Sequence, residues 1–195
     1  MNVSELAESL KKKVLTIEEN LGGMNDFSLN QQNKNFVQFL LSRITSYIEK
    51  ESGLSTSFMK YFDRLAQKPF EIEHIWANKY EQHKNDFESE EDFMDYRNRL
   101  GDLILVPNGF NQSYGGDSYV SKIKHYYGQN LLAQTLSNTC YEKNPSFKKF
   151  IKETQLPFKP YEHFTKDAID ERQELYQKIS ERIWSAASFD KILQE

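Results

Sequence analysis

Residues 70–76 read Phe70-Glu71-Ile72-Glu73-His74-Ile75-Trp76, and residues 100–106 read Leu100-Gly101-Asp102-Leu103-Ile104-Leu105-Val106. In the first stretch Phe70, Ile72 and His74 alternate with glutamates, and this period of two predicts a short strand. The apolar run that ends the second stretch stands just before Pro107 and predicts another strand. The sequence therefore predicts two short strands near the middle of the chain.

Helices are predicted around these strands. Ser89 is a suitable N-cap for a helix that leads to Gly101, and acidic residues in its first turn favour the positive end of the helix dipole. Elsewhere, apolar residues recur every three or four positions. These stripes predict helices over residues 3–21, 36–48, 58–65, 118–128, 130–137, 146–153 and 169–184. We expect a mostly helical α+β protein of one domain, residues 1–195, with a helical N-terminal part (1–69), a strand-containing core (70–128) and a helical C-terminal part (129–195).

The composition limits the class of protein. The chain has 195 residues and a formal net charge of -4, which argues against binding of nucleic acid or membrane by bulk positive charge. Its one cysteine, Cys140, excludes an internal disulfide and a Cys-rich zinc site, as suits a reducing cytoplasm. No apolar run approaches the roughly 20 residues that a membrane span needs. We expect a globular cytoplasmic protein with no membrane partner.

The charge is unevenly distributed along the chain. Residues 81–95 hold seven acidic side chains and one lysine, whereas residues 117–160 hold seven lysines and three acidic side chains. This contrast permits a polarised surface, with DNA approaching from the side of the later lysines.

Glu73 and His74 are the first candidates for chemistry. A carboxylate next to a histidine at the end of an apolar strand can supply a metal ligand and a general base together. A hydrogen-bonded histidine at the rim of the core is the structural alternative. In a regular strand the two side chains point to opposite faces, so both face one metal only if the strand ends or bulges there.

The order of several segments resembles a known family. The strand with Glu73-His74-Ile75 is followed by Leu100-Gly101-Asp102-Leu103, by Asn111 and by a helix with Lys122. This order resembles the HNH, or ββα-metal, nucleases, and more closely the C-terminal nuclease domain of GmrSD-type type IV restriction endonucleases. The segment with Arg172, Ile179, Ile183 and Trp184 is similar to the terminal helix of that domain, so the resemblance covers roughly residues 36–186.

The resemblance implies an HNH-like ββα-metal insert and a metal-dependent DNA endonuclease that hydrolyses phosphodiester bonds in restriction of foreign or modified DNA. His74 would be the general base, and Glu73 and Asn111 would be ligands of Mg²⁺, Mn²⁺ or another divalent cation. Oxygen donors suit such hard ions. Lys122 would contact phosphate or steady the motif. An NTP-dependent recognition domain or subunit, absent from this chain, would choose the target.

Some features leave alternatives open. Arg97, Arg99 and Lys124 are candidate contacts for DNA, but each is equally well read as a solvated cation. Asp102 stands where the family usually has Asn; an aspartate accepts hydrogen bonds but donates none unless it is protonated. It would either add a carboxylate to the metal site or weaken activity. The alternative function is a catalytically inactive module with the HNH fold that binds DNA or protein.

Overall fold

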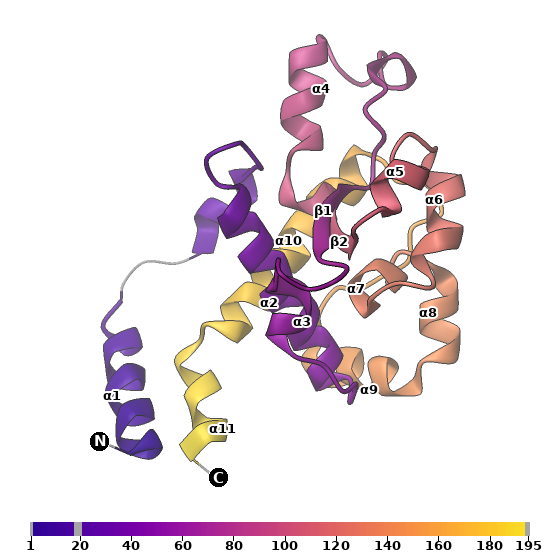
Figure 1. Ribbon diagram of the computed structural model, residues 1–195. Coiled ribbons are helices and arrows are strands. Elements are labelled where there is room, and N and C mark those ends of the chain that lie inside the picture. The colour runs from indigo at the N-terminus through magenta and orange to yellow at the C-terminus, as the bar shows by residue number, and fades with distance from the viewer. Residues whose placement is uncertain (1, 18–20, 194–195) are drawn as a thin grey trace.

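A two-stranded sheet lies among helices near the centre of the molecule (Figure 1). The computed structural model describes residues 2–17 and 21–193, except for the side chains at 111–112 and 191–192. Strand β1 (Phe70–His74) pairs antiparallel with β2 (Leu103–Pro107). The register runs without a bulge from Phe70 opposite Pro107 to His74 opposite Leu103. Both predicted strands are confirmed, and the protein is a mostly helical α+β protein.

Helical segments occupy most of the described chain outside the sheet. Before β1 they are α1 (Val3–Leu15), the 3-10 helix η1 (Leu21–Asp26), α2 (Lys34–Glu51) and α3 (Phe58–Phe62). Between the strands they are η2 (Tyr80–Gln82), α4 (Glu90–Arg97) and η3 (Leu100–Asp102). After β2 they are α5 (Phe110–Tyr114), α6 (Tyr119–Tyr126), α7 (Leu131–Gln134), α8 (Asn138–Lys143), α9 (Pro145–Thr154), α10 (Lys166–Ile183), η4 (Ala186–Phe189) and α11 (Asp190–Leu193).

Local signals explain several helix ends. The side chain of Ser89 accepts a hydrogen bond from the backbone N–H of Asp92, and α4 begins there as predicted. The first helix, expected to reach residue 21, instead ends at Leu15, because Thr16 takes the C-cap position. The short helices α5 and α8 were not predicted, since five or six residues are too few to display a helical period.

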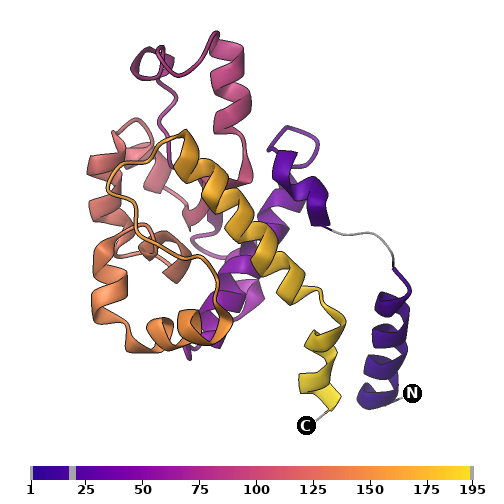
Figure 2. The same cartoon turned by 180° about the vertical axis from the view of Figure 1, so that it is seen from behind.

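Helix α10 passes behind the sheet and fixes the segment that enters β2 (Figure 2). The Gly101 N–H donates to Gln173 Oε1 at 2.7 Å, and Arg172 Nε donates to the Gly101 carbonyl at 3.0 Å. A Cβ at Gly101 would overlap the carbonyl oxygen of Ile169, so only glycine permits this close approach. The core continues from α2 through β2 to α10, and Cys140 is buried in it as a free thiol.

Helices α1 and α11 lie side by side at the edge of the molecule in both views (Figures 1 and 2). Lys11 forms an ion pair with Asp190 between them. Ala7 is the buried residue of α1, while Val3, Leu6 and Leu10 on its apolar stripe are exposed. Within residues 2–17 and 21–193, no helix combines the length and apolar character required to cross a membrane.

Candidate active site

The end of β1 places Glu73 and His74 on opposite faces of the sheet, as expected for a strand without a bulge. Glu73 is 3% exposed and points toward α6. Its Oε1 accepts hydrogen bonds from Lys122 Nζ at 2.7 Å and from the Tyr126 hydroxyl at 3.2 Å. Lys122 and Tyr126 stand four residues apart, so one face of α6 presents both groups to Glu73.

Lys122 is fully buried and ties α6 to the end of β1. Besides Glu73, its ammonium group donates to the backbone carbonyl of His74 at 2.8 Å. Removing one partner of such a buried pair leaves an uncompensated charge in the core. In this geometry Lys122 steadies the strand end, which is one of the two roles that the sequence suggested for it.

His74 is half-buried and turns toward the end of α4. Its Nε2 lies 3.0 Å from Oδ1 of Asn98, the C-cap residue of α4. An amide oxygen only accepts, so Nε2 carries the proton and Nδ1 keeps its lone pair. Burial and, to a smaller extent, the positive charge of Arg97 lower the pKa of His74 to about 3. The imidazole is therefore neutral near pH 7, and this low pKa makes Nδ1 a weaker proton acceptor than a free imidazole.

Asp102 is completely buried and closes the segment between the strands. Its Oδ1 accepts from the Trp76 N–H at 3.0 Å, and its carbonyl accepts from the Ile75 N–H at 2.8 Å. Asp102 thus accepts hydrogen bonds from two successive backbone N–H groups that follow His74. Its Oδ2 has no hydrogen-bond partner among the described residues, and burial raises the pKa of this carboxyl well above its usual value.

The three cations expected to contact DNA lie in different surroundings. Arg97 Nε donates to the Trp76 carbonyl at 3.0 Å, and burial lowers the pKa of this guanidinium. Arg99 pairs with Asp170 at 2.6 Å and lies over the ring of Tyr96. Lys124 is exposed on α6 and forms no ion pair within the described residues.

The described side chains do not form a ready ligand set for a divalent cation. No three His, Cys, Asp or Glu side chains of the described residues converge on one point. Glu73 is already bound to Lys122 on the face of the sheet opposite His74, and the side chain of Asn111 lies outside the described residues. The geometry therefore supports a role for His74 more directly than a ligand role for Glu73.

The other histidines are separate from this site. His83 stacks on Phe93, and His125 stacks on Tyr114 with a centroid distance of 3.9 Å. His163 is exposed in the segment before α10. These positions agree with structural or surface roles.

Sequence reasoning missed two residues that complete the site, Asn98 and Tyr126. Asn98 stands four residues before Asp102. In the sequence it looks like an ordinary residue at the end of a helix, and it is the C-cap of α4. Tyr126 reads as one more apolar position of α6, although its spacing from Lys122 places both on one helix face. The spacing was the available signal for Tyr126, whereas the contact of Asn98 with His74 depends on the tertiary fold.

Comparison with known proteins identifies the family of the chain. A family model described as GmrSD restriction endonucleases, C-terminal domain, matches residues 16–179, which include β1, β2 and α6. The searches of curated proteins and of solved structures found no match. The family match covers most of the sequence, so the chain belongs to the GmrSD restriction endonuclease C-terminal domain family.

Proposed function

We propose that this chain is an HNH-type DNA endonuclease domain that hydrolyses phosphodiester bonds with the help of a divalent cation, in restriction of foreign or modified DNA. The observation that carries the proposal is the position of His74 at the end of β1, where its Nε2 lies 3.0 Å from Asn98 Oδ1. The family supplies the nuclease class. The site then supplies an oriented imidazole whose Nδ1 has a lone pair for a proton of the attacking water.

The proposed chemistry uses the Nδ1 lone pair of His74. Nδ1 takes a proton from a water molecule, whose oxygen attacks the phosphorus while the bond to the leaving oxygen breaks. Asn98 accepts the hydrogen bond from Nε2–H throughout, so the imidazole keeps its orientation. The proton taken from water therefore binds at Nδ1. Asp102 and Lys122 hold the backbone at His74 and just after it, because Lys122 donates to the His74 carbonyl and Asp102 accepts from the Trp76 N–H.

A divalent cation, Mg²⁺ or Mn²⁺, would stabilise negative charge on the scissile phosphate. The described carboxylates do not form a ready ligand set for such a cation. Asn111, at the start of α5, is retained as the proposed ligand that the resemblance implies.

Plasmid nicking tests this proposal. Purified protein with Mg²⁺ or Mn²⁺ is expected to convert supercoiled DNA to the open circle, and excess chelator is expected to stop the reaction. Asn111→Ala is expected to lose nicking under the same conditions. No nicking by the unaltered chain with any divalent cation would overturn the proposed activity.

The second candidate is an inactive DNA-binding module, and the pairing of Glu73 with Lys122 favours it, because this carboxylate is engaged inside the protein. That function predicts salt-dependent DNA binding that persists in chelator, without cleavage of any substrate. Nicking that stops with chelator excludes it.

A further inference from the structure

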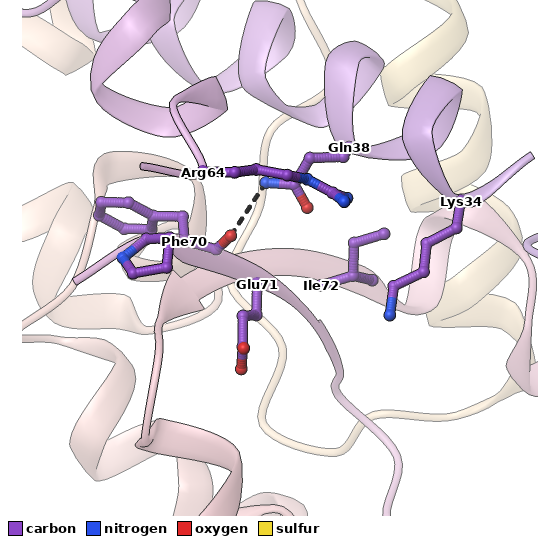
Figure 3. Close-up of a pocket in the computed structure, with 7 residues that line it drawn as sticks. Lys34, Gln38, Arg64, Phe70, Glu71 and Ile72 are labelled. Carbon is purple, nitrogen blue, oxygen red and sulfur yellow. Dashed lines mark hydrogen bonds between the residues drawn. The ribbon is translucent and has the colours of Figure 1, made fainter. Parts of the chain in front are cut away.

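A hollow of about 400 Å³ lies between helix α2 and the first residues of β1, Phe70–Ile72 (Figure 3). Lys34 and Gln38 line it from α2, Arg64 from the segment after α3, and Phe70 and Ile72 from β1. Gln38 closes its floor, because its Nε2 donates to the Phe70 carbonyl at 3.1 Å. We call this hollow the Lys34–Arg64 groove.

Positive charge dominates the groove. Lys34 and Arg64 are exposed, and neither has an ion-pair partner in the described part of the chain. The one carboxylate in the lining, Glu71, accepts a 2.7 Å hydrogen bond from Asn108 Nδ2. In Figure 3 Lys34 reaches from α2 toward the strand beside Ile72, whereas Glu71 points down from the strand.

Many other cations of this acidic protein are already neutralised. Arg99 pairs with Asp170, and Lys159 pairs with Glu171 at 2.7 Å. A second hollow, beside α4, is lined by Asp26, Asp92 and Asp95 together with its cations. The Lys34–Arg64 groove therefore keeps charge that is available to an anion.

The groove lies near the proposed base along β1. Ile72 lines it, and His74 lies two residues further on the same face of β1, about 7 Å along the strand. The N-terminus of α2 adds to the positive potential, because Lys34 is the first residue of this 18-residue helix and the Asn33 side chain does not cap it. A phosphodiester chain bound by Lys34 and Arg64 would continue toward His74.

Resting on the proposed nuclease function, we propose that the Lys34–Arg64 groove binds the phosphate backbone of DNA on its approach to His74. Neither residue belongs to the motif from which the nuclease activity is inferred. The lysines of residues 117–160, which the charge pattern of the sequence favours, form the competing surface.

DNA binding by two matched double variants tests this surface. The first is Lys34→Gln with Arg64→Gln. The control is Lys148→Gln with Lys152→Gln, which removes two exposed cations of α9 that form no ion pair within the described residues. Binding of a duplex is measured by fluorescence anisotropy over a series of salt concentrations, with His74→Ala in every protein so that the DNA stays intact. Thermal unfolding confirms that each variant is folded.

The groove variant is expected to raise Kd on the order of tenfold and to reduce the slope of log K against log salt by about two, since each lost phosphate contact removes about 0.9. The control is expected to keep both values. Equal losses of DNA affinity in the two variants, or a loss of affinity only in the control, would overturn the proposal that the groove binds DNA.

Nicking by the same double variants with His74 restored separates this proposal from the activity itself. The groove variant is expected to nick about tenfold more slowly at low DNA concentration, with the control unchanged. If the unaltered chain nicks and the groove variant binds and nicks equally well, the groove is wrong and the nuclease function stands. If the unaltered chain never nicks DNA, the proposed nuclease function fails, whereas the anisotropy measurements still decide whether the groove binds DNA.

Discussion

The proton on the His74 imidazole is placed by Asn98, a residue outside the motif. Replacing Asn98 with leucine removes the acceptor for Nε2–H, and the ring is then free to exchange tautomers and to rotate. Nicking is expected to fall by about 10- to 100-fold, the usual range for a residue that orients a functional group. The ¹⁵N shifts of His74 are expected to move from one tautomer toward a mixture, and unchanged shifts would contradict this role of Asn98.

Asp102 makes the stability depend on pH. The folded pKa of its carboxyl is raised above the unfolded value by burial, so this group's favourable contribution is complete below the unfolded pKa near 3.8 and is lost as the pH rises through the folded pKa. Asp102→Asn keeps the acceptor for the Trp76 N–H and removes the ionisation. We expect its melting temperature to exceed that of the unaltered protein by a few degrees at pH 8, where about 1 kcal/mol corresponds to about 2–4 °C.

The difference between Asp102→Asn and the unaltered protein is expected to shrink toward pH 4. Asp95→Asn, which changes an exposed carboxylate on α4, is the control and is expected to show no such trend. A gap in melting temperature that is equal at pH 4 and pH 8 would show that ionisation of Asp102 is not its source.

The close contact between η3 and α10 can be tested by adding a single methyl group at Gly101. Gly101→Ala would place its Cβ against the backbone of α10 at Ile169, so the two elements must separate. Overpacking of this kind costs about 1–3 kcal/mol. The melting temperature is expected to drop by several degrees in Gly101→Ala and to stay unchanged in Gly116→Ala, where a Cβ meets nothing within 4 Å. Equal melting of both variants would contradict the close approach.

The elements were predictable where a signal was local. Ser89 and the acidic residues after it gave the start of α4, and the apolar run at 103–106 gave β2. The end of α1 was missed because the apolar stripe continues beyond Leu15, although its side chains find little core to cover. A stripe of apolar residues shows which side chains a helix could bury, but the tertiary fold decides whether those side chains are buried.

Across the whole molecule, the sequence located the neighbourhood of the site but not its contacts. The alternation at Phe70 to His74 predicted that Glu73 and His74 face apart, and the structure agrees. The engagement of Glu73 by Lys122, 49 positions away in the chain, depends on how α6 packs, which no local pattern reports. The same holds for the juxtaposition of Lys34 and Arg64 beside β1.

The net charge of -4 does not show where positive charge lies on the surface of the folded chain. Ion pairs such as Arg99 with Asp170 neutralise many cations, and the unpaired ones decide where a polyanion can bind. Lys34 and Arg64 come from the first third of the chain, which showed no excess of positive charge in the sequence.

The measurement that tests the central claim most directly is plasmid nicking by His74→Ala beside the exposed-histidine control His163→Ala, each with Mg²⁺ and with Mn²⁺. Loss of a general base lowers the rate by about 100- to 10,000-fold, whereas His163 has no contact with the site. The account predicts that His74→Ala loses nicking with both ions and that His163→Ala nicks like the unaltered chain. Equal nicking by all three proteins across these ions would contradict the assignment of His74 as the base.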